Sequence, residues 1–380
     1  MNKKIKVAII SFPIDFLGGG FDIFKNWLTI IDKNKYDVHF ITCSSRWDKM
    51  KQKLKDISGI RAVNLNELNS SNRLYIPGIL KLTNYLRENK IDIVHTCMIQ
   101  ADIIGSIATK ISGVPVLVST VIGYLINTNQ GLNGRIKTLI YRMTYSLIKK
   151  WFATIFAISK ATSEELVREF GVNENQVKVN YCGIELPNNL KWVRKNQKGG
   201  ALKIGVIGEL KYAKGMNDFI EAIPDIIIKH PKVSFIVAGD GPEKPILEKK
   251  VKELEVDTIV DFLGWVNNPR DVIENMDIFV FPSLPSYDGL PRVILEAWAM
   301  CTTVVVTRVA CVPELFDGKN KGVTIQPGNP KGIAKAVNSL IEDRDKAEQM
   351  AKNAFNEIRN FDVKREVEQI ERTYQRLIIE

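Results

Sequence analysis

Short apolar runs alternate along the chain with longer segments in which apolar residues recur every three or four positions. The runs at 5–12 (IKVAIISF), 202–208 (LKIGVIG) and 278–281 (IFVF) are typical of strands that are buried on both faces. Gly, Pro, Asn and Asp separate these runs from the helical segments. The alternation of strand and helix predicts parallel sheets with helices on both sides.

This alternation occurs in two series, which predicts two domains. The first series continues with strands expected at 37–42, 61–65, 91–95, 114–119, 153–159 and 176–181. The second continues with strands expected at 233–241, 259–264 and 303–307. Residues 187–201, which contain several Asn, Lys and Gly, predict a linker between the series. We therefore expect an N-terminal domain over 1–186 and a C-terminal domain over 202–360.

The stretch 281–299 (FPSLPSYDGLPRVILEAWA) is a candidate binding site. It reads as a strand end, a loop, and a helix that begins near Pro291. A loop that leads into a helix offers free backbone N–H groups and the positive end of the helix dipole to a phosphate. Asp288 and Glu296 lie on either side of this point, and because carboxylates repel phosphate, we expect them to contact sugar hydroxyls. An ordinary strand, loop and helix with two solvated acids is the alternative interpretation.

The same stretch resembles the signature of retaining, nucleotide-sugar-dependent glycosyltransferases with the GT-B fold, the family 4-like transferases of group 1. Their pattern, EGLPxxxLEAMA, contains two Glu residues separated by seven positions, and Asp288 stands in the place of the first. The resemblance implies that Glu296 binds the donor ribose and that Asp288 contacts the transferred sugar as a catalytic residue. It also implies that backbone amides at Gly289, Leu290 and Val293 hold the donor diphosphate.

The loop 208–215 (GELKYAKG) resembles a second motif of these enzymes, GRLxxxKG, in which an Arg and a Lys clamp the diphosphate. Lys214 matches the Lys and is assigned to donor binding and to catalysis, since a cation stabilises the departing diphosphate. Glu209 occupies the place of the Arg in this donor site. An acid at that position weakens phosphate binding, because it replaces a phosphate-binding base.

Two glycines and two aromatic residues of the first half complete the candidate sites. Gly18 and Gly19 follow the first strand, and the resemblance implies that their amides face donor phosphates or the acceptor. His95 is expected to end a strand and so to point into the cleft, although a lone His is more often structural. Tyr124, in a Gly-Tyr pair, resembles relatives that glycosylate lipid-linked acceptors. His95 and Tyr124 are therefore assigned to the acceptor side.

The resemblance implies an α/β architecture of two Rossmann-like domains that face each other across a cleft. The first would bind the acceptor and the second the nucleotide sugar, and residues 361–380 would form a helix that crosses back to the first. The expected donor is a UDP-sugar, without a metal or other cofactor, and the expected acceptor is a lipid-linked saccharide of capsule, O-antigen or exopolysaccharide synthesis. A UDP-sugar 2-epimerase and a catalytically inactive GT-B partner protein are the alternatives.

Charge is unevenly distributed along the chain. The formal net charge is +10; residues 1–190 hold 25 Lys and Arg against 15 Asp and Glu, whereas the other half holds 28 of each. A basic half favours an anionic partner, either a membrane, a lipid diphosphate or nucleic acid. Nucleic acid is disfavoured because no recognition motif or set of stacking aromatics accompanies the basic residues. A lysine-rich solvated surface is the alternative.

Residues 135–151 (RIKTLIYRMTYSLIKKW) are the candidate membrane contact. Their basic, amphipathic and aromatic character is typical of a helix that lies in a membrane interface. One helical face carries five apolar residues: Ile136, Leu139, Ile140, Met143 and Leu147. A domain helix that buries this face is equally compatible with the pattern.

Targeting signals and cysteines bear on where the protein acts. The chain shows no signal peptide and no apolar run of ~20 residues, and its five scattered cysteines favour reduced thiols. We therefore expect a cytoplasmic protein, or one bound peripherally to the inner face of the cell membrane.

Overall fold

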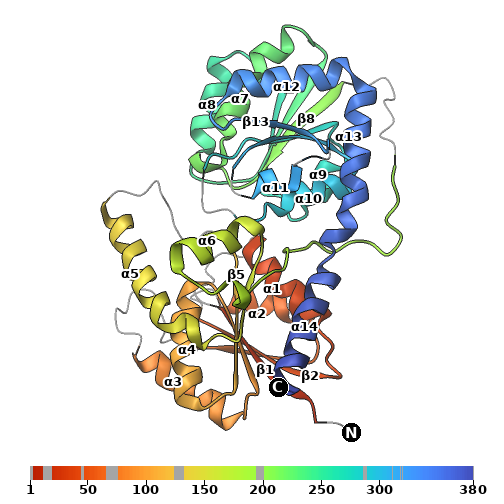
Figure 1. Ribbon diagram of the computed structural model, residues 1–380. Coiled ribbons are helices and arrows are strands. Elements are labelled where there is room, and N and C mark those ends of the chain that lie inside the picture. The colour runs from red at the N-terminus through yellow and green to blue at the C-terminus, as the bar shows by residue number, and fades with distance from the viewer. Residues whose placement is uncertain are drawn as a thin grey trace. The chain divides into compact units, whose positions relative to one another are not determined.

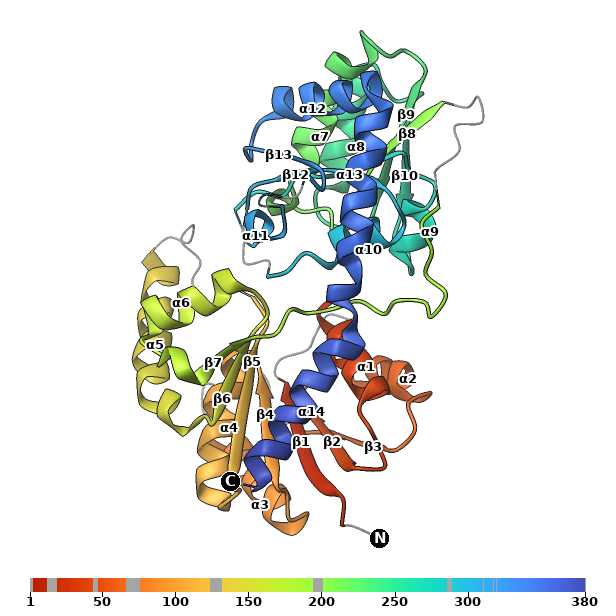
Figure 2. The same ribbon diagram turned by 45° about the vertical axis from the view of Figure 1, so that its right-hand side comes forward.

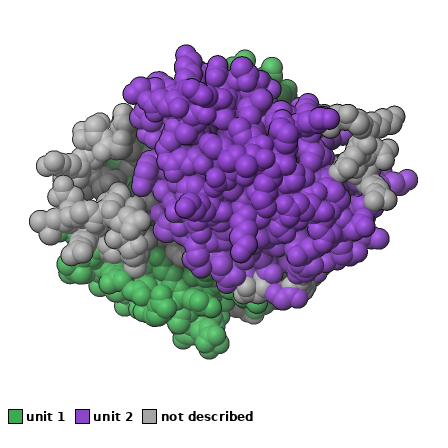
Figure 3. Space-filling model, turned by 90° about the horizontal axis from the view of Figure 1, so that it is seen from above, with its two compact units in different colours: residues 1–185, 363–380 green, residues 186–362 purple. Residues whose placement is uncertain are grey.

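The computed structural model describes residues 3–11, 19–43, 47–65, 76–123, 132–193, 201–285, 289–309, 311–316, 318 and 320–379. The chain, drawn as a ribbon in Figure 1, divides into two compact units, which Figure 3 shows in different colours. The first unit comprises residues 1–185 and 363–380, and the second comprises residues 186–362. Each is built on a parallel sheet with helices on both faces (Figure 2). The two Rossmann-like parallel sheets predicted from the sequence are thus confirmed.

The sheet of the first unit has the strand order β3-β2-β1-β4-β5-β6-β7, and every pair is parallel. All positions of β1 from Val7 to Ser11 are buried, because helices cover both of its faces. The strands are β1 (Ile5–Ser11), β2 (Tyr36–Thr42), β3 (Ile60–Asn64), β4 (Ile93–Cys97), β5 (Val116–Val121), β6 (Thr154–Ala157) and β7 (Val177–Val179).

Helices pack on both faces of this first sheet. On one face, Ile10 of β1 and Ile104 of α4 belong to a single apolar cluster with residues of α3, α5 and α6. On the other face, the Trp27 ring of α1 packs on the His95 ring, with 5.4 Å between their centroids. The helices are α1 (Gly19–Ile30), α2 (Trp47–Leu54), α3 (Ile76–Glu88), α4 (Ile99–Ser112), α5 (Leu132–Ile148), α6 (Lys160–Phe170) and α14 (Val363–Ile379), with 3₁₀ turns η1 (Lys149–Trp151) and η2 (Glu174–Gln176).

Buried polar contacts fix the C-terminal helix α14 in the first unit. The carboxylate of Glu366 is buried and accepts hydrogen bonds from Nε1 of Trp27 and from the backbone N of Gly183, both at 2.8 Å. The hydroxyl of Tyr374 hydrogen-bonds to Nδ1 of His95. Figure 2 shows α14 lying beside α1 against the sheet. The C-terminal helix of the chain therefore packs in the same unit as its first strand and first helix.

The sheet of the second unit has the strand order β10-β9-β8-β11-β12-β13, again all parallel. Val206, Val237 and Val280 pack in one core with Phe219 of α7 and Val337 of α12. The strands are β8 (Leu202–Ile207), β9 (Val233–Ala238), β10 (Val260–Gly264), β11 (Ile278–Phe281), β12 (Thr303–Thr307) and β13 (Val323–Ile325). The sequence pattern did not predict β13, because three residues are too few to show a period.

Helices again cover both faces of the second sheet. The helices are α7 (Met216–Ile227), α8 (Lys244–Glu253), α9 (Pro269–Ile273), α10 (Arg292–Ala299), α11 (Val312–Phe316), α12 (Pro330–Glu342) and α13 (Arg344–Glu357), with 3₁₀ turns η3 (Tyr212–Lys214) and η4 (Ile358–Phe361). Residues 186–193 belong to this unit as well, and there the Trp192 ring packs against Phe355 of α13.

Candidate functional site

The chain changes direction at the centre of the second sheet. It runs outward from β8 through β9 to β10, and then returns to place β11 on the other side of β8. The loops that follow β8 and β11 therefore leave the carboxyl edge of the sheet on either side of this switch point. Open α/β sheets bind their ligands at such a point. The two loops begin at Gly208 and Pro282, in the same two stretches that the sequence nominated.

The backbones of these loops are in close contact. A Cβ atom on Gly215 would lie 2.0 Å from the backbone oxygen of Pro282, and Gly215 has a φ of +65°. A Cβ atom on Gly239, which follows β9, would lie 1.8 Å from the backbone oxygen of Gly208. Only glycine fits at either position, because a side chain would collide with fixed main-chain atoms. The absence of side chains lets three loop backbones meet at one edge.

Hydrogen bonds fix the loops in this arrangement. The backbone N of Leu284 donates to the carbonyl of Ala213, and that of Leu210 donates to the carbonyl of Asp240, each at 2.9 Å. The buried hydroxyl of Thr307 donates to the carbonyl of Ser283 at 2.6 Å. Satisfied main-chain groups hold a loop in one conformation, so the edge is a preformed surface.

The loop 208–215 carries two cations and one acid. Lys214 ends the turn η3 and is half-buried. Lys211 forms an ion pair with Glu209, with 2.6 Å between Nζ and Oε2, and both side chains are about half exposed. The acid that stands where the related motif has an Arg is therefore partly neutralised by its neighbour, and Lys214 supplies the net positive charge of the loop.

Helix α10 begins at the end of the second loop. Pro291 precedes its first turn and makes no side-chain hydrogen bond that would cap the N-terminus. The first amides of a helix have no partner inside the helix, so they can accept an anion. The buried face of α10 contains Ile294, Leu295 and Trp298. Burial of this face fixes the direction in which the N-terminus points.

The other face of α10 is partly open to solvent. Val293 and Glu296, three residues apart, are both half-buried on this face, and Glu296 lies in the second turn. Leu290 is buried ahead of the helix, and the thiol of Cys311 contacts the carbonyl oxygen of Gly289 at 3.4 Å. The structure thus places the nominated residues of this stretch, from Gly289 to Glu296, around one helix N-terminus.

Three nominated residues lie outside the described residues: Gly18, Tyr124 and Asp288. Gly19 is the first residue of α1. The roles assigned to these four residues stay predictions.

His95 does not end its strand, as the sequence analysis expected. It is the third residue of β4, which begins and ends two positions later than predicted. Its ring is completely buried, with Nε2 2.7 Å from the hydroxyl of Thr120 and Nδ1 bonded to Tyr374. Burial lowers the pKa of His95 to about 3, which keeps the ring neutral. The structure gives His95 a role in joining α14 to the sheet, and contact with an acceptor stays a prediction.

Two further residues at carboxyl edges of the sheets were not predicted from the sequence. Trp265 directly follows β10 and is 62% exposed, although Trp is usually well buried. Met98 directly follows β4 and has a φ of +79°, a conformation that is unusual for any residue except glycine. A Trp directly after a predicted strand was a detectable signal in the sequence, whereas nothing in the sequence indicates the backbone conformation of Met98.

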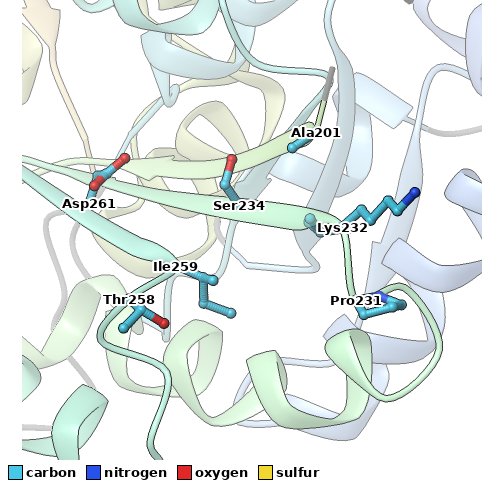
Figure 4. A pocket seen from close by; sticks show the side chains of 8 residues that line it. Ala201, Pro231, Lys232, Ser234, Thr258, Ile259 and Asp261 are labelled. Atoms are coloured by element: carbon cyan, nitrogen blue, oxygen red, sulfur yellow. The ribbon is translucent and has the colours of Figure 1, made fainter. Parts of the chain in front are cut away.

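A shallow hollow of about 430 Å³ lies at the opposite end of the second sheet (Figure 4). It is lined near the amino ends of β9 and β10 by residues that include Lys232, Ser234 and Asp261. Figure 4 shows the side chains of Lys232 and Asp261 at different ends of the hollow. Ligands of open α/β sheets bind at the other edge, so the hollow is not the candidate site.

Two family models match the chain and together cover most of it. Glycosyltransferase Family 4 matches residues 26–187, and Glycosyl transferases group 1 matches residues 189–357. The first match falls in the first unit apart from its last two residues, and the second contains both loops and α10 of the candidate site.

Similar proteins include two bacterial transferases that align over nearly the whole chain. One is the Escherichia coli UDP-Gal:alpha-D-GlcNAc-diphosphoundecaprenol alpha-1,3-galactosyltransferase, 24% identical over 100% of this chain and 98% of its own. Another is the capsular polysaccharide biosynthesis glycosyltransferase CapM of Staphylococcus aureus, 25% identical over 94% and 93%.

A solved structure shows the same fold. HepE of Anabaena, crystallised in complex with UDP, superposes with a TM-score of 0.80 at 21% identity, covering 98% of this chain and 100% of that one. The two parallel sheets, the position of the loops and the two family matches agree. The chain therefore has the GT-B fold and belongs to the family 4-like glycosyltransferases of group 1.

Proposed function

We propose that this glycosyltransferase moves a sugar from a UDP-sugar to a saccharide carried on a lipid diphosphate, during synthesis of capsule, O-antigen or exopolysaccharide. One observation carries the proposal: the loop with Lys214 packs against the loop that leads into α10, at the switch point of the second sheet. A cation and a helix N-terminus at one edge fit a diphosphate. The name of the Escherichia coli relative supports the acceptor class, and the name of the Staphylococcus aureus relative supports a role in capsule synthesis.

Each residue of the site has a proposed role. The amides of Gly289, Leu290 and Val293 bind the diphosphate with Lys214, and Glu296 accepts hydrogen bonds from the donor ribose. Asp288 binds the transferred sugar. The half-buried position of Glu296 on the open face of α10 supports its role, because a carboxylate there reaches a ligand without entering the core.

The proposed reaction retains the configuration of the anomeric carbon. The bond from this carbon to the phosphate oxygen breaks, the bond to the acceptor oxygen forms, and the acceptor proton passes to the departing diphosphate. Lys214 and the α10 N-terminus stabilise the charge that develops on the diphosphate. Because these groups supply the positive charge, we propose that transfer needs no metal ion and proceeds unchanged in EDTA.

Donor binding is tested directly by titrating UDP in a calorimeter. Glu296→Ala is expected to lower the affinity by about two orders of magnitude, since it removes charged hydrogen bonds worth roughly 2–3 kcal/mol. Glu253→Ala, which removes an exposed acid at the end of α8, is the matched control and should bind UDP normally. Equal affinity of Glu296→Ala and the wild type would remove the ribose assignment.

The acceptor and the stereochemistry need a separate assay. A panel of UDP-sugars is incubated with a saccharide diphosphate that carries a short polyprenyl chain, and the product is examined by NMR. An axial linkage from an axial donor supports retention, and an inverted linkage contradicts it. Loss of UDP from the donor with no disaccharide product would indicate that the acceptor class is wrong.

A further inference from the structure

Helix α5 of the first unit exposes a continuous apolar stripe. Five of its side chains are between 49% and 68% exposed: Ile136, Leu139, Ile140, Met143 and Leu147. Their spacing places them on one side of the helix over roughly 16 Å of its length. The stripe is the same apolar face that the sequence indicated, and the structure shows it turned away from the core.

The opposite side of α5 provides the attachment to the first unit. Tyr145 and Ile148 are completely or nearly buried, in a cluster with residues of α4 and α6. Figure 1 and Figure 2 both show α5 beside α6. The helix is thus apolar on two sides, and only one of them is needed for folding. Contiguous exposed apolar side chains of this kind mark an interaction surface.

The charges around the stripe indicate the nature of its partner. Helix α5 and the turn η1 after it, residues 132–151, contain five Lys or Arg and no Asp or Glu, whereas the neighbouring helix α6 contains Glu164, Glu165 and Glu169. Lys150, just after α5, is exposed, while Arg142 pairs with Glu169 of α6. A second copy of the chain would bring two basic helices together, which like-charge repulsion opposes. An anionic lipid surface accommodates both the apolar side chains and the basic ones.

We propose that the exposed stripe of α5 docks the protein on an anionic lipid bilayer, with the apolar side chains among the lipid head groups and acyl chains. No helix in the described parts of the chain is long and apolar enough to cross a membrane. The proposal extends the proposed function, because a lipid-linked acceptor is held at such a surface. Docking by α5 requires no bound nucleotide, so the two can be tested independently.

Vesicle co-sedimentation of the full chain tests the proposal. Vesicles of phosphatidylcholine with about one-third phosphatidylglycerol are compared with vesicles of phosphatidylcholine alone. The triple variant Leu139→Gln, Met143→Gln, Leu147→Gln should bind the anionic vesicles with an affinity that is lower by a factor of about ten or more. Polar side chains do not enter the acyl region. The wild type should lose binding as salt is added.

The matched control changes exposed apolar residues of the second unit. Ile228 and Ile246 are 79% and 56% exposed, so Ile228→Gln, Ile246→Gln should bind vesicles as the wild type does. Both variants should bind UDP normally, which separates docking from the proposed donor site. The proposal is overturned if the wild-type protein does not bind anionic vesicles, or if the triple variant binds them with the same affinity as the wild type. A wild-type dimer that the triple variant converts to monomer identifies a second copy as the occupant and also overturns it.

Insertion itself can be measured with one introduced thiol. All five native cysteines are buried, so a cysteine introduced by Met143→Cys can be labelled selectively with an environment-sensitive dye. Anionic vesicles should shift the emission of this label to shorter wavelength and leave a label at Ile246→Cys unchanged. Equal shifts at both positions, or none at Met143→Cys, contradict insertion of the stripe.

Discussion

Glu209 is the residue at which the candidate site departs most from the motif that it resembles. It stands in the place of a phosphate-binding Arg, and its carboxylate holds Lys211 at 2.6 Å. An acid here has two unfavourable effects on an anionic donor: it adds a negative charge and it neutralises a neighbouring cation. Both effects are partly screened, because the two side chains are about half exposed.

Replacing this acid should improve donor binding. We expect Glu209→Arg to raise the affinity for UDP roughly three- to tenfold at low salt, with a smaller gain at high salt. Calorimetric titration at two salt concentrations measures the change. Glu253→Arg introduces the same charge on α8 and serves as the control for the long-range effect. An affinity that falls, or that rises equally in both variants, would show that Glu209 lies away from the bound phosphates.

Asp102 is a buried acid outside the candidate site. In the first turn of α4, its Oδ1 accepts hydrogen bonds from the hydroxyls of Thr96 at 2.5 Å and Ser119 at 2.7 Å. Burial raises the pKa of Asp102 to about 7, against an ordinary value of 3.8, and the hydrogen bonds from Thr96 and Ser119 offset part of this rise. Between these two values the folded chain binds a proton that the unfolded chain releases.

Stability should therefore fall as the pH rises through this range, because the unfolded state binds fewer protons. Asp102→Asn keeps an oxygen for Thr96 and Ser119 but cannot ionise. From pH 5 to pH 8 we expect this variant to gain on the order of 2 kcal/mol over the wild type in unfolding free energy. Urea unfolding at both pH values tests this, and a constant difference between the two proteins would argue against it.

At the scale of elements, buried polar contacts fix α14 together with its buried apolar side chains. Glu366 joins α14 to α1 through Trp27 and to the segment after β7 through Gly183. Main-chain contacts add to this, since the backbone N of Asp32 donates to Oε1 of Glu371 at 2.7 Å. A buried carboxylate without hydrogen-bond partners destabilises the folded state, because its desolvation is not compensated. The same holds for buried N–H donors that lose their carboxylate acceptor.

Truncating Glu366 should consequently destabilise the first unit. We expect Glu366→Ala to lower its unfolding free energy by about 3 kcal/mol, because two buried N–H donors lose their acceptor. Glu368→Ala, on the same helix, removes an exposed acid that forms an ion pair with Arg372 four residues on, and should change stability by less than about 0.5 kcal/mol. Urea unfolding followed by circular dichroism compares them, and equal effects of the two substitutions would contradict this account.

At the scale of the whole molecule, each unit has its own sheet, its own core and its own charge. Residues 1–185 with 363–380 hold the entire excess of basic residues, and residues 186–362 are balanced. The loop with Lys214 and the N-terminus of α10 lie in the second unit, and the exposed stripe of α5 lies in the first. Donor binding and surface docking are thus assigned to separate cores.

Hydrogen exchange followed by mass spectrometry can test this separation. UDP should slow exchange in peptides that cover 208–215 and 289–296, because their amides lie around the proposed diphosphate. Peptides from 132–148, which form α5, should exchange at the same rate with and without UDP. Protection that appears in α5 but not in the two loops would show that the first unit, and not the second, binds the nucleotide.

The sequence by itself determined the local features of this protein. Apolar runs identified the strands that are buried on both faces, because apolar residues occupy most positions of such strands. Pro291 indicated where α10 begins, and the structure starts this helix at the next residue, Arg292. Such signals lie within a few residues of each other, so they are present in the sequence.

Tertiary structure alone decided which distant segments meet. The contact of Gly215 with Pro282 follows from the order of strands in the sheet, and the bond between His95 and Tyr374 joins residues 279 positions apart. For α5, both sides of the helix are apolar, and only packing through Tyr145 determined that the stripe at Met143 faces outward. Local periodicity determines which residues share a side of each helix or strand. Which of two apolar sides becomes buried depends on the free energy of packing against neighbouring elements.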